Sequence, residues 1–533
     1  MERLKSTTRT VSTKAAASVK QAVSAESRAK AVAKTKEMAV AAQAKYVEVD
    51  AAVDSKLVSL VSSSRAQLLA VSFTVLLIVG PGIGLNAVGG ITLADSGADV
   101  LFVTRVVEYS FAIVGGLLAG PLSNMLGPRL LLCAAAVAQL CVLGSQLFLW
   151  TKEDNRGSLT SNGVQFAIFS AAVAAATRAL LFAAAAPAVL AYVSESRKAV
   201  ALASFASIYG LSFIAAQATN VALTWAKDSF GILPTYTYWI ALPLPLVGWA
   251  LSLLVLRPWQ VVHKGKSVMT GAKPTVRGEL TQAKLLFSNK GLWTLAACVA
   301  LMSYYNGTTI AFTPVSLTDT ITSSARTTSL IKLVYQVAYL LGVWIISLSL
   351  LDNIDHPRAK RARMTSAMLI VALMVVLVGT YIKAVTIYGA YSVYGLFDGF
   401  THAFFVWLVG SFSNSPIKQS RYVGFLYAIY YLVNATKYAV TENVSVVLTY
   451  DKFISIGLVV IALIVMGAFN FHFVGDTCEE EDEHEVAFKS NIISGDSPIQ
   501  LEEAAAKKGD FRKGDEHKGR NNEGGKKVVF ADA

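Results

Sequence analysis

Runs of apolar residues about the length of a membrane-crossing helix recur along most of the chain, separated by shorter polar stretches. A helix needs roughly 20 apolar residues to cross the hydrocarbon core of a bilayer. The pattern therefore predicts an all-α polytopic membrane protein with twelve transmembrane helices. The spans are expected near residues 66–88, 100–120, 129–150, 164–187, 199–222, 236–256, 291–313, 329–350, 364–382, 386–410, 422–440 and 453–474.

The two ends of the chain lack this pattern. Residues 1–64 contain no Gly or Pro and are rich in Ala, Val, Ser and Lys, a composition that favours helix. Their charges interrupt any apolar stripe, so we expect a cytosolic region that is helical or partly disordered. A helix that lies on the membrane or binds a partner is the alternative. Residues 475–533 begin GDTCEEEDEHE and have the composition of a disordered cytoplasmic tail, with an interaction tail as the alternative.

The longest polar stretch between spans is basic and divides the predicted helices into six and six. It covers residues 257–290, so the first six-helix half is expected over 65–256 and the second over 291–474. Two six-helix halves around a site at the middle of the membrane are typical of major facilitator transporters. The layout therefore favours a major-facilitator-like fold.

The basic residues of the short loops predict the orientation of the chain, because cytoplasmic loops carry an excess of Lys and Arg. The loops after even-numbered spans are rich in Lys and Arg, and the loops after odd-numbered spans carry few. We therefore expect both termini in the cytoplasm. The residues that decide this are Arg129, Arg197, Lys198, Arg257, Lys264, Lys266, Lys273, Arg277, Lys284, Lys290, Arg358, Lys360, Arg361, Arg363, Lys418 and Arg421.

Composition narrows the class of protein further. The 533 residues are 54% hydrophobic and 15% charged, with a mean hydropathy of +0.51, whereas an ordinary soluble domain has about 25% charged residues. The formal net charge of +12 resides largely in the predicted cytoplasmic loops, so we expect the lipid bilayer and no nucleic acid as a partner. Three of the four cysteines lie inside apolar runs, and no spacing predicts a metal or cofactor site.

The turn between the second and third spans reads GPLSNMLGPRLLL. It resembles the Gly-x-Leu-x-Asp-Arg-x-Gly-Arg-Arg loop of the major facilitator superfamily, through Gly120, Leu122, Gly127 and Arg129. Asn124 stands where the superfamily has an acid. The glycines predict a tight turn and close helix approach, but the missing acid weakens the expectation of a charged latch between neighbouring helices.

Three stretches resemble the Unc-ninety-three-like family, which is named for an ion-channel regulatory protein. PGIGLNAVGG at the end of the first span is similar to the family's Gly-Met-Phe-Asn-Ala-x-x-Gly-x-Gly-Gly signature. ALLFAAAAPAVLAYVSESRKA resembles its small-residue fourth span, and YGLFDGFTHAFFVWLVGSFSNSPIKQSRYVGFLYAI its tenth and eleventh spans. The matching residues are Pro81, Gly82, Asn86, Ala87, Gly89, Gly90, Tyr192, Glu195, Lys198, Tyr394, Gly395, Asp398, Trp407, Gly410, Asn414, Arg421, Gly424 and Phe425.

The glycines and proline of the first span predict close packing and bending of that helix. A helix broken beside a cavity is the alternative. Asn86 then becomes a candidate polar contact near the outer end of the span. Many relatives carry a Tyr-Lys-Gly-Ile-Gln run after Gly424 and Phe425, and this chain has LYAIYYLVNATK instead, which leaves the role of that run open here.

Charged side chains inside the predicted spans are the main candidates for function, because each costs about 2.5–3.5 kcal/mol near the membrane centre. Arg105 and Glu108 are three residues apart on the second span and can meet on one helix face. Arg178 lies in the middle of the fourth span and keeps its charge, so it needs an acceptor. Glu108 and Asp398 both qualify. A structural ion pair is the alternative to a functional site.

Asp398 and His402 are four apart on the tenth span and share a face. A carboxylate beside an imidazole can relay protons or sense pH, and hydrogen bonding between helices is the alternative. Further polar side chains suit a binding cavity, although hydrogen bonds between helices explain them as well. They are Tyr304, Tyr305, Asn306, Gln336 and Asn434.

Two functions follow from this pattern. The first is a transporter that moves a small solute or ion by alternating access, with Arg178, Glu108 and Asp398 at its site. The second is a non-transporting accessory protein that regulates or traffics another membrane protein, a role that the family resemblance implies for some relatives. No enzymatic motif is present, so we expect no catalysis. Asn443 begins a glycosylation sequon, Asn-Val-Ser, on the predicted outer side.

Overall fold

A computed structural model describes most of the membrane region of the protein. The described residues are 61–96, 98–150, 161–227, 235–263, 266–267, 275–306, 325–353, 355–381, 387–443 and 445–474. Within these helices, the side chains of several terminal segments lie outside the description, among them 83–102, 304–306 and 438–456.

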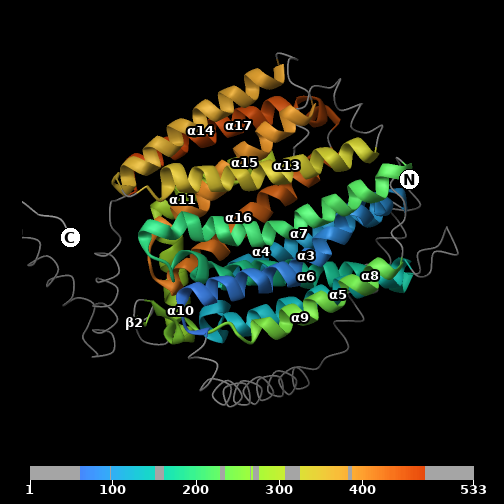
Figure 1. The fold of residues 1–533 in the computed structure, drawn as a ribbon, viewed down its shortest axis with the longest axis horizontal. Coiled ribbons are helices and arrows are strands. Elements are labelled where there is room, and N and C mark those ends of the chain that lie inside the picture. The colour runs from blue at the N-terminus through green and yellow to red at the C-terminus, as the bar shows by residue number, and fades with distance from the viewer. Residues whose placement is uncertain are drawn as a thin grey trace, which may run out of the picture. The chain divides into compact units, whose positions relative to one another are not determined.

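The described residues form helices that run side by side (Figure 1). The first group is α3 (Ser64–Ser96), α4 (Ala98–Leu126), α5 (Pro128–Trp150), α6 (Ser161–Leu190), α7 (Lys198–Lys227), α8 (Thr235–Ala241) and α9 (Pro243–Ser252). The second group is α11 (Lys290–Asn306), α13 (Ala325–Ile346), α14 (Arg358–Tyr381), α15 (Ile387–Phe412), α16 (Pro416–Asn443) and α17 (Ser445–His472). The linker between the groups contains β1 (Val262–His263), β2 (Lys266–Ser267) and α10 (Val276–Ser288). Shorter elements are η1 (Glu195–Arg197), η2 (Pro258–Gln260) and η3 (Ser347–Leu351).

Among the described residues, seven helices are long and apolar enough to cross a membrane. They cover Ser64–Gly82, Val103–Leu126, Pro128–Leu147, Val164–Leu190, Lys198–Leu223, Ser329–Leu351 and Tyr388–Phe412. Shorter apolar helical stretches lie at Tyr238–Ser252, Lys290–Ser303 and Gly457–Asn470. The expectation of an all-helical, multi-pass integral membrane protein is therefore confirmed.

Two local features differ from the expected pattern. The span expected over 236–256 is interrupted between α8 and α9, because Pro243 begins the second helix and has no backbone N–H to donate. The second helix ends at Ser252. The stretch expected as a loop over 257–290 contains α10, whose first turn is capped by the Thr275 side chain accepting from the Gly278 N–H at 3.2 Å.

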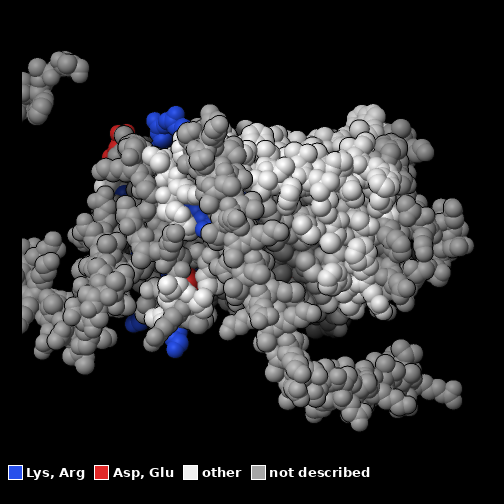
Figure 2. All heavy atoms as spheres, turned by 90° about the horizontal axis from the view of Figure 1, so that it is seen from below, with Lys and Arg blue, Asp and Glu red and all other residues white. Residues whose placement is uncertain are grey.

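The lateral surface of the helices is apolar. Large side chains such as Val371 and Ile464 are more than 60% exposed, as expected where lipid replaces water. Figure 2 shows the charged side chains of the described residues gathered toward one end on this face, the end where α10 and β2 lie in Figure 1. We call this the α10 end. There α4 ends and α7 and α16 begin.

Small residues bring the helices together in two similar arrangements. Within the first group α4 packs closely on α6, and within the second α13 packs closely on α15. A Cβ on Gly115 would lie 2.7 Å from Ala176 Cα, and one on Gly342 would lie 3.1 Å from Leu396 Cα. Between the groups, α4 packs on α16 and α7 on α13. Close contact of backbones is thus built into the sequence at these glycines.

The glycine-rich end of the first span forms a continuous helix. α3 remains helical from Ser64 through Pro81 to Ser96, so the helix is not broken there. A Cβ on Gly80 would lie 2.7 Å from Ser212 Cβ on α7, and one on Gly82 the same distance from Gln139 Oε1 on α5. These two positions therefore serve close packing against neighbouring helices.

Candidate functional site

Glu108 lies between two arginines inside the helix bundle. Its Oε1 accepts from Arg178 Nη1 at 3.2 Å, across the close α4–α6 contact. Its Oε2 accepts from Arg105 Nη1 at 2.8 Å, one turn away on the same helix. The Glu108 side chain is 12% exposed, against 23% for Arg178 and 39% for Arg105. The structure thus pairs Arg178 with Glu108, and one carboxylate serves two cations.

Aromatic side chains from three helices pack against one another next to Arg178. Tyr431 of α16 lies beside Arg178 and packs against the buried Ala112 and Ala175. Beside it, Phe182 of α6 stacks on Tyr427 of α16, with ring centroids 4.9 Å apart. The cluster therefore joins the first group of helices to the second.

Phe182 also meets Tyr209 of α7 edge-on at 5.7 Å. Tyr427 in turn lies 6.2 Å from Tyr430 and 6.0 Å from Tyr431, measured between ring centroids. We call Phe182, Tyr209, Tyr427, Tyr430 and Tyr431 the aromatic layer. Its members combine flat apolar rings with hydroxyl groups that can donate or accept hydrogen bonds.

Asp398 occupies the second group of helices. It is 8% exposed and accepts a hydrogen bond from the Tyr335 hydroxyl of α13. His402, one turn along α15, is exposed, and its ring meets Tyr339 of α13 edge-on at 5.9 Å. In the described part of the chain no hydrogen bond joins Asp398 to His402. Asp398 contacts Tyr335 and His402 contacts Tyr339, both on α13. The described contacts therefore show no direct path for a proton between Asp398 and His402.

The structure describes fewer contacts for the remaining predicted site residues. Gln336 is half-buried on α13. Asn434 donates from Nδ2 to the Tyr430 carbonyl at 2.8 Å, so this hydrogen bond lies within α16 and does not join two helices. The side chains of Asn86, Tyr304, Tyr305, Asn306 and Asn443 lie outside the described residues.

The loop motif forms a second polar cluster at the α10 end. A Cβ on Gly120 would lie 2.5 Å from Arg421 Cα on α16, and Gly127 turns the chain with a φ of +86°. Arg129 is buried and donates from Nε to the Val255 carbonyl at 3.1 Å. Asn124 donates from Nδ2 to the Ile417 carbonyl at 3.2 Å. The motif thus attaches α4 to α16, and the start of α5 to the segment that follows α9.

The acid that the loop lacks is supplied by α10. Glu279 is 2% exposed and forms a two-pronged ion pair with Arg421, Oε1 to Nη2 at 2.7 Å and Oε2 to Nε at 2.9 Å. Both carboxylate oxygens lie 3.3 Å from Asn124 Nδ2. A charge pair is therefore present beside the loop, but α10 and α16 form it and the loop itself does not. The clue in the sequence is that Glu279 is the one acid between 257 and 290.

A second polar cluster, similar to the one between α4 and α16, joins α7 to the second group of helices. Lys198 is 1% exposed and donates from Nζ to the Gly410 carbonyl at 2.6 Å and to Asn414 Oδ1 at 2.5 Å. The Asp352 carboxylate, just after η3, accepts from the backbone N–H groups of Ala199 and Val200 at 3.0 and 2.7 Å. A carboxylate at the first turn of a helix is favoured by the helix dipole. No pattern in the sequence indicates Asp352.

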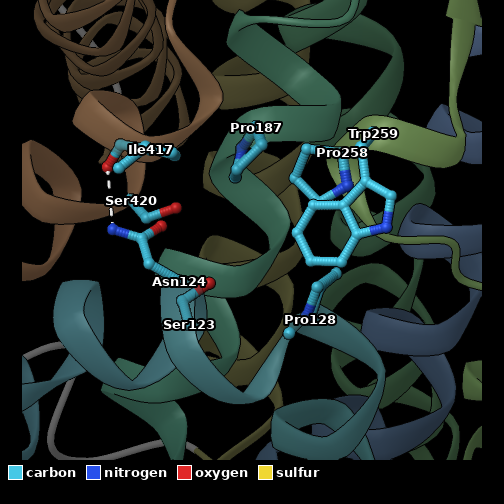
Figure 3. A pocket seen from close by; sticks show the side chains of 9 residues that line it. Ser123, Asn124, Pro128, Pro187, Pro258, Trp259, Ile417 and Ser420 are labelled. Atoms are coloured by element: carbon cyan, nitrogen blue, oxygen red, sulfur yellow. Dashed lines mark hydrogen bonds between the residues drawn. The ribbon is translucent and has the colours of Figure 1, made fainter. Parts of the chain in front are cut away.

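A small pocket lies beside the loop motif, where α4, α6, η2 and α16 meet. Figure 3 shows Asn124 reaching across to Ile417, with Trp259 over the turn at Pro128. The lining residues are Ser123, Asn124, Gly127, Pro128, Pro187, Pro258, Trp259, Ile417 and Ser420. In the described part of the chain, no group of three or more His, Cys, Asp or Glu residues could hold a metal ion.

Known proteins resemble this chain in sequence and in fold. UNC93-like protein C922.05c from Schizosaccharomyces pombe (strain 972 / ATCC 24843) is 26% identical over 388 residues, which cover 68% of this chain and 73% of that protein. No family model matches the chain.

Among solved structures, the proton:xylose symporter XylE bound to 6-bromo-6-deoxy-D-glucose has a TM-score of 0.55 and 15% identity, over 79% of this chain and 96% of the symporter. A bacterial homologue of the iron transporter ferroportin in its outward-facing state, with soaked iron, has a TM-score of 0.57 and 12% identity, over 75% of this chain and 98% of that chain. The Escherichia coli fucose:proton symporter FucP has a TM-score of 0.53 and 13% identity, over 77% and 98%. The chain thus has the fold of the major facilitator superfamily and is similar to its Unc-ninety-three-like members, as the three sequence stretches predict.

Proposed function

We propose that this protein is a major-facilitator-like transporter that moves a small solute or ion across the membrane by alternating access. The observation that carries the proposal is the ion pair of Arg178 and Glu108 inside the helix bundle, which meets Tyr431 from the other group of helices. A polar site shared by two helix groups becomes accessible to one side or the other when the groups rock. The solved neighbours with this fold are named as symporters or transporters.

The proposal includes a two-half organisation. A described helix overlaps each of the twelve expected spans, with α8 and α9 together in the sixth. Residues 65–256 would form the first half, 257–290 the linker and 291–474 the second half. The paired contacts support this division, because exchanging the halves turns α4–α16 into α13–α7. The basic residues of the loops favour a cytoplasmic location for both termini and for the α10 end.

Within this scheme, Arg178, Glu108 and the aromatic layer form the solute site. Arg178 Nε is buried with no hydrogen-bond partner, so the guanidinium retains a donor for a solute. Asp398 with Tyr335 provides a second polar position in the other half, and His402 lies one turn away. Asn86, Tyr304, Tyr305, Asn306 and Gln336 remain further candidates for the pathway.

An accessory protein that regulates or traffics another membrane protein is the second candidate. It is favoured by the close aromatic stacking of Phe182 on Tyr427, which packs the first group of helices against the second. It also accords with the similarity to a protein named UNC93-like. The terminal regions 1–64 and 475–533 would then be candidate partner-binding segments.

Uptake into vesicles distinguishes the two functions. Purified full-length protein would be reconstituted into proteoliposomes and incubated with a mixture of sugars, amino acids, organic acids and metal salts, under an imposed pH gradient. The lumen would then be analysed by mass spectrometry. We expect at least one solute to accumulate above protein-free vesicles, and Arg178→Ala to abolish the difference. Arg363→Ala, an exposed position on α14, is the matched control. No accumulation with folded wild-type protein would refute transport.

A further inference from the structure

The linker helix α10 lies across the contact between the two groups of helices. It packs against α4 on one side and α16 on the other. Glu279, the buried acid of its first turn, contacts Asn124 of α4 and Arg421 of α16 at once. Gln282, one turn along, lies 3.5 Å from Arg421 Nη1. A segment that connects the groups in sequence is therefore also bound between them in space.

The α7–α13 contact corresponds to the α4–α16 contact, and it shows which type of residue occupies the position equivalent to Asn124. Gly115 of α4 and Gly342 of α13 play the same part, because each allows contact with the backbone of the next helix but one, α6 or α15. Asn124 follows Gly115 by nine residues, and Asp352 follows Gly342 by ten.

The one-residue difference has a structural cause. The end of α13 continues as a π-helical turn, η3, and such a turn accommodates one extra residue within a helix. Asp352 is therefore the counterpart of Asn124. At the α7–α13 contact, the acid at this position binds the start of α7 directly.

We propose that Glu279 of α10 replaces the acid missing at position 124 and locks the α4–α16 contact, so that α10 must undock for the α10 end to open. This inference rests on the proposed alternating-access function. Its geometric basis is the burial of both partners, 6% for Arg421 and 2% for Glu279. Removing one partner of a buried ion pair leaves an uncompensated charge, whereas moving the acid to a nearby position retains the pairing.

The electrostatic consequence is specific to this arrangement. Placing a second carboxylate at position 124 would set two acids against each other, because Asn124 Nδ2 lies 3.3 Å from both Glu279 oxygens. With Glu279 neutralised, the same carboxylate would instead face Arg421 across the same cluster. Asn124→Asp should therefore loosen the lock by itself and restore it in combination with Glu279→Gln. A purely structural role of Glu279 predicts no such reversal.

Accessibility of a buried cysteine measures the lock without any transport. Ser420 is 1% exposed on α16 beside the pocket, and Ser420→Cys would be introduced into a full-length chain whose native cysteines are replaced. Modification by a water-soluble maleimide would be timed in detergent. We expect Glu279→Gln to label about tenfold faster than its parent, since a charge-assisted hydrogen bond is lost. Asn124→Asp/Glu279→Gln should return to within about twofold of the parent.

The control is Lys284→Gln, at an exposed position of the same helix, which should label at the parent's rate. If Glu279→Gln fails to give a monodisperse protein, recovery of a monodisperse peak in the double variant supports the proposal and failure to recover overturns it. Parent-like labelling of folded Glu279→Gln also overturns it. Because labelling needs no solute, these results stand apart from the vesicle assay, which tests the proposed function separately.

Discussion

Replacing Glu108 by Gln tests whether the pair with Arg178 or the pair with Arg105 holds this charged cluster together. Glu108 accepts from both arginines, at 3.2 and 2.8 Å. We expect the longer contact, to Arg178, to stabilise the protein more than the shorter contact to Arg105. Arg105 is 39% exposed and only three residues away on the same helix, whereas Arg178 is 23% exposed and lies on another helix.

The two pairs differ in expected free energy. An exposed pair within one helix contributes about 0.3–0.5 kcal/mol. A hydrogen bond to a charged group in a largely buried setting contributes about 1.5–3 kcal/mol. Glu108→Gln should therefore lower the free energy of unfolding by about 2–3 kcal/mol, and Arg105→Gln by about 0.5 kcal/mol.

Thermal unfolding of detergent-solubilised protein, followed by size-exclusion chromatography after heating, gives the ranking. The midpoint of Glu108→Gln and of Arg178→Gln should fall well below that of Arg105→Gln, which should stay near wild type. A double-mutant cycle between positions 108 and 178 should return a coupling of about 2 kcal/mol. Equal midpoints for the Arg105 and Arg178 variants would show that the contact between α4 and α6 does not depend on this ion pair.

Three further changes test separate contacts. Gly116→Leu should lower the melting temperature by forcing apart α4 and α16, where a Cβ would lie 2.8 Å from a backbone nitrogen of α16, whereas Gly457→Leu, with open space around it, should not. Tyr335→Phe should destabilise the protein by about 1–3 kcal/mol in thermal unfolding, because the buried Asp398 carboxyl loses its donor; an unchanged midpoint would mean that another donor replaces it. Asp352→Ala should reduce stability by about 0.5–2 kcal/mol by uncapping α7, and hydrogen exchange at the first turn of α7 should rise.

The helices could be predicted from sequence because the bilayer imposes a length and a polarity on each span. The polarity of the bilayer also predicts that Arg178, a charged residue inside a span, needs a hydrogen-bond acceptor. It could not choose between Glu108 and Asp398, since the choice depends on which helices touch. That is decided by close contacts such as Gly115 against Ala176, which brings α4 onto α6, and these contacts join residues far apart in sequence.

The polar clusters at the α10 end were harder to predict for a different reason. The motif around Asn124 lacks the acid of the superfamily pattern, and nothing in the motif itself indicates that an acid elsewhere in the chain supplies the charge. Glu279 lies 155 residues further along in a stretch whose basic residues dominate its composition. Asp352 likewise follows a π-helical turn that shifts the spacing by one residue, which conceals its correspondence to Asn124.

The charged cluster and the lock respond to different experiments because they lie on different parts of α4. Glu108 and Arg178 lie near the middle of their helices, while Asn124 lies in the last turn of α4. A transporter needs both, since solute binding at the first must be coupled to opening at the second. An accessory protein needs only the packing. Loss of uptake in Arg178→Ala with normal labelling at Ser420→Cys would assign Arg178 to the solute rather than to the scaffold. Loss of both together would instead indicate that the cluster holds the helix groups in place.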